Sequence, residues 1–594
     1  MTRCLSPLCA AYVAVAVLSP FSFSATIDVL SSGVTGDGSN ETSVIQAVID
    51  GASAGDTLYF GSPPTAYGVA SINVGKPLTL LGDGWTCGEE GREARTGGTF
   101  EGAEIRQVSG DGTIVSIGTS NATIDGLKIK GRGYTGPRGS NTVIYATGSK
   151  TNITVRNCWL CETNNRCIDF THGVSHVVVQ NNRIEDIHYV GVMLHEVKVA
   201  HVIGNHIEDL QDPVSGEIYH NGYGIVISGD DPAADAIPED IILQDNFVKH
   251  VPEWHCINNH YGERVLAVDN DVRDAEVGLV KTYKPQTGLA GGYNLYINNY
   301  AENHTRNGSW CIGPRQMGTS YPYEQDNHFI GNTYKDVVKN YSRGQEGFRV
   351  HHEKWINPPT DIWYFANGHL DLHHSNNDPD GGYDLEAGQP LSYKNTFTTP
   401  DAPADLTVVA DASKVTLTWT MTDSEHDSFE LQRSDNGSTG WQTVAWRPPN
   451  INRWKFTSTN PNLVPFDPLM YIYRAANEGH YRIRAWNGNE SSAWSNVSEA
   501  GGATSLETGV SRRSAARLSV SPQPVTARAD ISFAPASPNL RLSVHTLQGE
   551  LVHELLDIRD VRAEWDASAY PNGMYVVRLQ IGNRVHSVTM LVAR

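Results

Sequence analysis

The segment "DAEVGLVKTY", residues 274–283, combines residue types that suit proton transfer with residue types that bind a hard cation. Lys281 can accept a proton once neighbouring positive charge lowers its pKa, and Tyr283 can donate one. Asp274 and Glu276 stand one residue apart, a spacing that points two side chains to the same side of a β-strand. The segment therefore predicts an acid–base site, with calcium as the cation that the two carboxylates would share.

The same segment belongs to a series of equivalent short segments. In each of them residues 2 and 4 are usually apolar, whereas residues 3 and 5 alternate to the opposite face. Position 4 is Asn259, Lys281 and Pro314 in three successive segments, and a buried unpaired lysine is costly. We therefore expect the strand to bend outward there and to expose Lys281. The series is CIDFTH, GVMLHE, GIVISG, CINNHY, GLVKTY, CIGPRQ and GFRVHH.

Such a bend would gather basic and imidazole side chains on one exposed groove. Cleavage of a uronate polymer by β-elimination requires neutralisation of the carboxylate, a base for the C5 proton and an acid for the leaving oxygen. An arginine suits the carboxylate because its guanidinium binds it through two parallel hydrogen bonds. The candidate catalytic residues are Lys281, Arg315, His260 and Tyr283, and the candidate substrate-binding residues are His195, Arg349 and His351.

A second repeat indicates the architecture that would position these residues. Asparagines followed by an apolar strand recur along the chain, with two short strands for each period of about 22 to 36 residues, which is typical of a parallel β-helix. We expect these asparagines to stack and to occupy left-handed bends. They are Asn157, Asn182, Asn205, Asn246, Asn270, Asn299 and Asn332.

The segment "GVTGDGSNETSVIQAVIDGASAGDTLYFG" resembles the start of the pectate-lyase-like right-handed β-helix superfamily, in which a short helix caps the open end. The resemblance implies a parallel β-helix over residues 25–398 and a cap helix with Val44, Ile45, Val48 and Ile49 on its buried face. It leaves the reaction open, because that superfamily contains lyases, hydrolases, epimerases and phage fibres.

"DAEVGLVKT" also resembles a strand of the chondroitinase-B and alginate-lyase family of β-helix lyases. The resemblance implies that Asp274 and Glu276 help to hold calcium, that Lys281 is the base, and that Arg315 neutralises the uronate. The sequence departs from the family at Gln316, where a histidine is usual. The implied function is a secreted polysaccharide lyase acting on alginate, pectin or a glycosaminoglycan.

Two other functions stay open. A β-helix glycoside hydrolase would use a pair of carboxylates, for which Asp169 with Glu196 or Asp231 are the candidates. The partner motifs of polygalacturonases, the arginine motif of classical pectate lyases and the motif of mannuronan epimerases are missing from the sequence. A non-catalytic surface adhesin would bind a glycan without turnover.

The remaining segments predict an exported chain with the all-β fold class. Residues 1–24 read as a signal peptide, and no other apolar segment is long enough to span a membrane, so the mature chain should lack a transmembrane segment. Residues 402–498 resemble a fibronectin type III domain. Residues 517–594 resemble the C-terminal sorting domain of the type IX secretion system, which implies that secretion machinery as a partner and a secreted or outer-membrane-surface location.

Charge and cysteine content narrow the partners further. The formal net charge of −21 disfavours nucleic acid as a partner, but allows an acidic polysaccharide if the cleft is locally basic. Cys167, Cys256 and Cys311 begin equivalent strands, which predicts stacked buried thiols. The sequence thus predicts a right-handed parallel β-helix followed by two small β-sandwich domains.

Overall fold

The computed structural model describes the chain from residue 24 to residue 592 with gaps. From 280 to 283, in the strand Ile312–Gln316 and in most strand residues between 340 and 373, only the backbone is described. The described ranges are 24–84, 100, 102–133, 139–210, 222–229, 237–260, 262–283, 294–304, 312–316, 327–337, 340–344, 348–351, 354–356, 362–366, 370–373, 398–410, 415–422, 426, 428–448, 470–473, 479–487, 490–500, 517–521, 525, 528–534, 540–546, 551–555, 562–571, 573–581 and 584–592.

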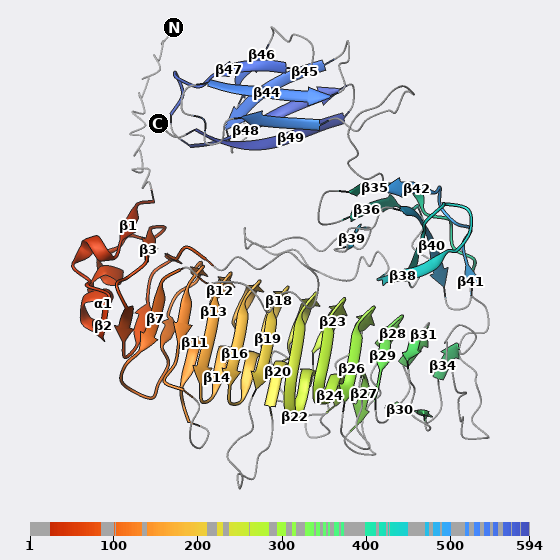
Figure 1. The fold of residues 1–594 in the computed structure, drawn as a ribbon, viewed down its shortest axis with the longest axis horizontal. Helices are drawn as coiled ribbons and strands as arrows, with labels where there is room; N and C mark the ends of the chain where they lie inside the picture. Colours follow the sequence, from red (N-terminus) through yellow and green to blue (C-terminus); the bar gives the residue numbers. More distant parts are fainter. Residues whose placement is uncertain are drawn as a thin grey trace, which may run out of the picture. The chain divides into compact units, whose positions relative to one another are not determined.

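Most of the first 373 residues wind into parallel coils (Figure 1). Each complete coil contributes one strand to each of three faces, here called A, B and C, so the chain has three strands per coil rather than the predicted two. Face A is a 13-stranded parallel sheet. Its strands are β1 (Thr26–Asp28), β3 (Thr57–Tyr59), β6 (Thr79–Leu81), β9 (Thr123–Asp125), β12 (Thr151–Arg156), β15 (Ser175–Gln180), β18 (Lys198–Ile203), β21 (Glu239–Gln244), β23 (Glu263–Val268), β25 (Leu295–Ile297), β28 (Asn327–Ile330), β31 (Phe348–His351) and β34 (Leu370–His373).

Faces B and C share one 21-stranded sheet, because the long strands β22 (Phe247–Asn259) and β24 (Asp271–Tyr283) run through both. The other strands of face B are β2 (Asp37–Asn40), β4 (Ala66–Val69), β7 (Glu104–Gln107), β10 (Lys128–Lys130), β13 (Trp159–Thr163), β16 (Arg183–Ile187), β19 (His206–Leu210), β26 (Tyr300–His304), β29 (Thr333–Lys335) and β32 (Lys354–Ile356). Those of face C are β5 (Ile72–Val74), β8 (Val115–Ile117), β11 (Thr142–Thr147), β14 (Arg166–Thr171), β17 (Val190–His195), β20 (Gly222–Ser228), β27 (Ile312–Gln316), β30 (Asn340–Gly344) and β33 (Ile362–Ala366).

The side chains that point into the coils form one apolar core. Positions 2 and 4 of the face C segments, such as Ile168, Phe170, Val192 and Leu194, are fully buried in it. The alternation that the sequence showed therefore separates core from surface, as a β-strand requires. The protein has the predicted fold, a right-handed parallel β-helix.

A ladder of buried asparagines joins face A to face B. Asn182, Asn205, Asn246, Asn270, Asn299 and Asn332 stack, and each amide Nδ2 donates to the Oδ1 of the next at 2.9–3.0 Å. None of the six is more than 1% exposed. Each Oδ1 after the first also accepts the backbone N–H of the preceding ladder residue, as Asn246 does from Asn205 at 3.1 Å. The ladder thus satisfies buried polar groups that no water reaches.

Two details of the predicted ladder are wrong. Asn157 precedes the ladder position, which Cys158 holds by donating its backbone N–H to Asn182 Oδ1 at 3.0 Å. The left-handed bend is made by the residue before each ladder member, for example Asn181 at φ 53° and Asp245 at φ 56°. Asn, Asp and Gly tolerate this conformation best, so asparagine richness at two adjacent positions blurred the register.

Helix α1 (Thr42–Gly51), preceded by the 3₁₀ turn η1 (Leu30–Ser32), lies at the start of the coils. Ile45 and Ile49 are buried and Val48 packs against the core, as predicted. Val44 is 39% exposed, so its predicted burial is wrong. Val44 precedes Ile45 by one residue, and successive side chains of a helix are about 100° apart around its axis. Val44 therefore lies at the edge of a narrow apolar stripe.

The described cysteines are buried free thiols, and they are Cys158, Cys161, Cys167 and Cys256. The burial predicted for Cys167 and Cys256 is therefore confirmed. Burial raises the pKa of the Cys158 thiol to about 12. Cys311 lies outside the described residues.

Two antiparallel sandwiches follow, and the chain divides into two compact units, Met1–Ala503 and Thr504–Arg594. The prediction of a fibronectin type III domain stays a prediction, although its region does form two facing sheets. Among the described residues, no helix is both long and apolar enough to cross a membrane. The first sandwich contains β35 (Ala404–Ala410), β36 (Val415–Thr420), β37 (Ser428–Ser434), β38 (Gln442–Arg447), β39 (Met470–Tyr473), β40 (Gly479–Asn487), β41 (Glu490–Ser491) and β42 (Ser498–Ala500), and the second contains β43 (Arg517–Ser521), β44 (Arg528–Ala534), β45 (Leu540–Thr546), β46 (Leu551–Leu555), β47 (Arg562–Asp566), β48 (Gly573–Ile581) and β49 (Arg584–Val592).

Within the first unit, the first sandwich packs on the outer side of face A. Trp446 and Trp486 form an apolar cluster with outward residues of face A, among them Leu266. Arg447 Nη1 donates to Asp269 Oδ2 at 2.5 Å, with side chains only 3% and 12% exposed. The sandwich therefore covers apolar surface and neutralises a buried carboxylate of the β-helix.

We predict that Asn246→Ala lowers the free energy of unfolding of the β-helix by about 3 kcal/mol, because it leaves buried donors of Asn205 without their acceptor. Exposed Asn73 on β5 is the control, and Asn73→Ala should change the free energy by less than about 0.5 kcal/mol. Urea unfolding of both variants measures this, and equal effects would contradict the ladder's role.

Truncation tests the packing of the first sandwich. A chain ending at Ala503 should unfold at the temperature of the full β-helix, because every contact within the first unit is kept. A chain ending before Thr398 loses Arg447 and both tryptophans. It should unfold at a lower temperature and bind an apolar dye, since Asp269 and the apolar cluster are uncovered. Identical melting curves for the two truncations would refute this packing.

Candidate functional site on face C

The outward positions of face C bring together three of the residues that sequence patterning singled out, Asp169, His195 and His260. The parallel register sets Asp169 beside Met193 and Met193 beside Val226, and it sets Thr171 beside His195 and His195 beside Ser228. It also sets Tyr223 beside His255. We call these outward positions of β14, β17, β20 and β22, with His260 directly after β22, the outer strip. They are Arg166, Asp169, Thr171, Val190, Met193, His195, Tyr223, Val226, Ser228, His255, Asn258 and His260.

The one carboxylate of the outer strip is buried and paired. Arg166 Nη1 donates to Asp169 Oδ2 at 2.7 Å, and the side chain of Asp169 is 5% exposed. The Oδ1 of Asp169 is buried without a hydrogen-bond partner among the described residues. A half-satisfied buried carboxylate is poised to accept a hydrogen bond from a donor that enters the strip.

Aromatic rings form the floor beside this pair. The ring of Tyr223 lies 6.0 Å from that of Tyr189, 5.6 Å from that of His255 and 5.9 Å from that of His260. Trp254 packs on His255 with centroids 4.5 Å apart. Such apolar rings with polar tips are typical of binding surfaces.

Lys281, Tyr283 and Arg315 are located by their backbone register alone. Lys281 pairs with Asn259 in the coil before it and with Pro314 in the coil after it, and Thr282 pairs with Arg315. No register shift interrupts β22 and β24 between Ile257 and Asn259. Arg315 thus takes the register position that Thr282 holds one coil earlier.

The predicted outward bend is wrong at Asn259. Its side chain is 1% exposed, and it donates to Tyr296 Oη at 3.0 Å and accepts the N–H of Gly262 at 2.6 Å. Partners inside the coil can therefore satisfy a polar group at position 4, so a polar residue there does not require a bend. Lys281 holds this same register position.

Arg349 and His351 lie on face A, and their predicted place beside the other candidates is wrong. They belong to β31, where Arg349 pairs with His328 and His351 with Ile330. The segment GFRV alternates like every strand of the coil, so its pattern could not assign a face. The face C strand that follows β27 is β30, in which Arg343 pairs with Arg315. Sequence patterning missed Arg343, and counting three strands per coil would have found it.

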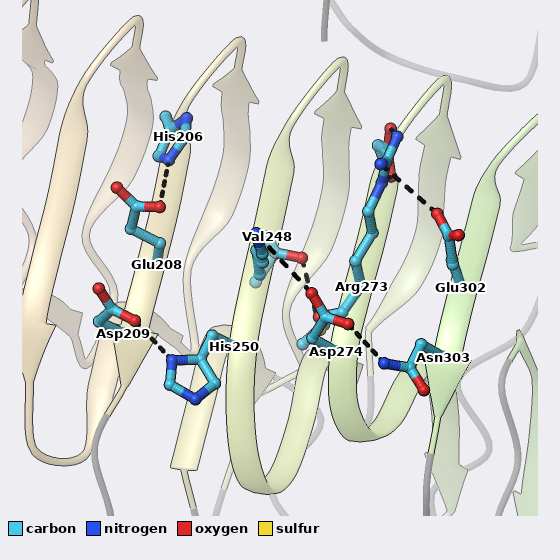
Figure 2. Close-up of polar contacts among 12 residues, drawn as sticks. His206, Glu208, Asp209, Val248, His250, Arg273, Asp274, Glu302 and Asn303 are labelled. Atoms are coloured by element: carbon cyan, nitrogen blue, oxygen red, sulfur yellow. Dashed lines mark hydrogen bonds and ion pairs between the residues drawn. The ribbon is translucent and has the colours of Figure 1, made fainter. Parts of the chain in front are cut away.

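Asp274 and Glu276 lie on either side of the buried Ala275, and both are of intermediate burial. Asp274 has φ 48° and forms the corner between the two halves of β24. Its carboxylate accepts from Asn303 Nδ2 at 2.6 Å (Figure 2) and lies 3.9 Å from Lys249 Nζ. The shared side of Asp274 and Glu276 stays a prediction.

His195 ends β17 and is 6% exposed. Its Nε2 lies 3.6 Å from Oε1 of Glu196, whose Oε2 is 3.0 Å from Nδ1 of His172. These three residues are the one group of histidines and acidic side chains, within the described part of the chain, that could together hold a metal ion. The sequence named His195 and Glu196 for other roles and missed His172.

Comparison with known proteins identifies one segment. Residues 519–593 match the family described as the secretion system C-terminal sorting domain. The sorting domain predicted from the sequence is therefore confirmed, and it indicates that the chain is exported. No curated protein matches the chain.

Solved structures are similar to this chain at low identity. The mannuronan C-5 epimerase AlgE6 A-module of Azotobacter vinelandii is similar over 61% of this chain and 97% of its own, with 15% identity and a TM-score of 0.42. The polygalacturonase of Erwinia carotovora ssp. carotovora covers 62% and 96%, with 14% identity and a TM-score of 0.40. The Dettilon tailspike protein covers 95% and 93%, with 11% identity and a TM-score of 0.38. Identities this low leave the reaction of this chain open.

We predict that Arg166→Leu destabilises the β-helix by about 2–3 kcal/mol, because it leaves the buried carboxylate of Asp169 without its cation. Adding Asp169→Asn to that variant should recover part of the loss, since the charge is removed. A double-mutant cycle followed by urea unfolding measures the coupling. Additive effects of the two substitutions would contradict the ion pair.

Proposed function

We propose that the protein is an exported polysaccharide lyase that cleaves a uronic-acid-containing polymer by β-elimination. The observation that carries this proposal is the charge of the outer strip. Its described residues include three imidazoles, from the buried His195 and His255 and the half-buried His260, and its single carboxylate is already paired with Arg166. In a chain of net charge −21, a strip without an unpaired carboxylate among its described residues suits an anionic polymer.

Register supports a role for Arg315 and His260 in the chemistry. His260 directly follows Asn259, and its backbone N–H donates to the carbonyl of Ile227 at 2.8 Å. The backbone hydrogen bonds that join this coil to the preceding coil therefore continue as far as His260. Thr282 and Arg315 hold the corresponding register positions of the next two coils. Two coil spacings are about 10 Å, enough to place one sugar unit between His260 and Arg315.

In this arrangement Arg315 neutralises the uronate carboxylate, which acidifies the C5 proton. Neutral His260 accepts that proton, and Tyr283 donates to the leaving oxygen. Lys281 is the alternative base, as its resemblance to the lyase strand implies, although its register position is that of buried Asn259. Substituting each residue in turn distinguishes whether His260 or Lys281 is the base.

Hydrolysis is the weaker alternative. A glycoside hydrolase requires two carboxyl groups that flank the bond, one of them free to protonate the leaving oxygen. Asp169 is paired with Arg166, and Glu196 is hydrogen-bonded to His172. A glycan-binding adhesin would use the same strip without turnover.

Calcium at Asp274 and Glu276 stays a prediction. An ion there would have to compete with Asn303 and with the ammonium of Lys249 for the Asp274 carboxylate. Loss of turnover in a chelator, restored by calcium and absent from Asp274→Asn, would support it. Full turnover in the chelator would remove it.

The test is incubation with alginate, pectin and glycosaminoglycans, followed by the ultraviolet absorbance of unsaturated uronates, with a reducing-end assay in parallel. We expect both signals to rise on at least one polymer. Reducing ends without absorbance would identify a hydrolase, and neither signal despite binding would identify an adhesin.

On the active polymer, His260→Ala and Arg315→Ala should each lower turnover by at least about a hundredfold, a typical loss for a proton acceptor or a charge-stabilising group. Lys281→Arg should stay active if His260 is the base, and be nearly inactive if Lys281 is the base, because guanidinium stays protonated. His176→Asn on face A is the matched control. Wild-type turnover of His260→Ala together with an inactive Lys281→Arg would transfer the role to Lys281.

A further inference from the structure

A three-residue cluster lies at the turn that follows β14 and β17. His172 and Glu196 directly follow these strands and both adopt left-handed backbone conformations, with φ 51° and 59°. His172 N–H donates to the carbonyl of His195 at 3.0 Å. Because the same bend recurs in neighbouring coils, the two side chains leave the backbone next to each other, with His195 beside them.

The distances between the three side chains suit a metal ion. Nδ1 of His172 is 3.0 Å from Oε2 of Glu196, and Nε2 of His195 is 3.6 Å from Oε1 of Glu196. One ligand atom from each residue lies within 4.8 Å of the others. In a tetrahedral site with bonds of about 2.0–2.2 Å, ligand atoms are about 3.3 Å apart. Small side-chain rotations would therefore bring all three onto one ion.

Burial gives the cluster two fixed ligands and one accessible ligand. The side chains of His195 and Glu196 are 7% and 14% exposed, whereas that of His172 is 63% exposed. An ion can thus reach the cluster from solvent at His172. A cation would also offset the cost of holding the Glu196 carboxylate away from water.

We propose that His172, His195 and Glu196 bind one divalent transition-metal ion of the zinc class. Two imidazoles and one carboxylate are ligands that zinc and its neighbours prefer, whereas calcium and magnesium take oxygen ligands. Three protein ligands leave a fourth position for water or another oxygen ligand. The proposal shares His195 with the outer strip, but it uses none of the residues assigned to proton transfer or to neutralisation of the uronate, and zinc binding is measured without any polysaccharide.

The described part of the chain contains a matched pair with no third ligand among the described residues. At the corner between faces B and C, Nδ1 of His250 is 2.5 Å from Oδ1 of Asp209, and both residues have positive φ, 58° and 55° (Figure 2). The His250 side chain is 56% exposed, close to that of His172. A histidine–carboxylate contact on neighbouring coils is therefore present at both places, and among the described residues only the first has a second histidine.

The experiment titrates zinc into the full chain, produced without a polyhistidine tag and stripped of metal, by calorimetry at pH 7.5. Cobalt absorption spectra report the ligand geometry. We expect one strongly bound ion per chain. His172→Asn and Glu196→Gln should each weaken binding by at least about tenfold, and His250→Asn should leave it unchanged. Asparagine tolerates the left-handed conformation, so the two histidine variants should fold alike.

Acid should weaken the same binding, because protonated imidazoles cannot be ligands. At pH 5.5 we expect the zinc affinity of the wild type to fall, and the difference in zinc affinity between the wild type and His172→Asn to become smaller. The proposal is overturned if the wild type binds no zinc at micromolar concentrations. It is also overturned if His172→Asn and Glu196→Gln bind zinc as tightly as the wild type, since the ion then lies elsewhere.

Discussion

The parallel register between successive coils is the constraint on which the rest of this structure depends. Each coil stacks on the last at the spacing of hydrogen-bonded strands, about 4.8 Å, so equivalent residues one coil apart in the sequence become direct neighbours. The asparagine ladder holds that register at one corner, because each amide can satisfy its own hydrogen-bonding groups only if the next coil is aligned. A slip of one residue would leave a row of buried amides unpaired and would turn core side chains outward.

This register explains what the sequence could and could not predict. Ladder asparagines such as Asn182 and Asn205 recur with apolar strands, and that recurrence was enough to predict the β-helix. The same alternation occurs on all three faces, however, so it could not place Arg349 and His351, which lie on face A. Asn157 was misassigned for a similar reason, because asparagine is favoured both in the ladder and at the bend before it.

The candidate site likewise contains residues that the sequence could place and residues that it could not. Outward positions inside a strand, such as Asp169 and His195, follow from alternation and were identified from the sequence. Residues with positive φ do not, because His172, Glu196 and Asp274 lie at left-handed bends, where the simple alternation of a strand is interrupted. The chemistry of the bend at His172 was therefore missed.

Net charge describes this protein poorly because its acidic residues are unevenly distributed over the faces. On face B, carboxylates alternate with cations across coils, as Glu302 does with Arg273 at 3.4 Å (Figure 2). Such half-buried pairs neutralise one another. The outer strip of face C instead combines imidazoles and aromatic rings with one carboxylate, and that carboxylate has its own arginine. A strongly acidic chain can therefore contain a strip whose described residues include no unpaired carboxylate, and the parallel register aligns the outward residues of that strip from coil to coil.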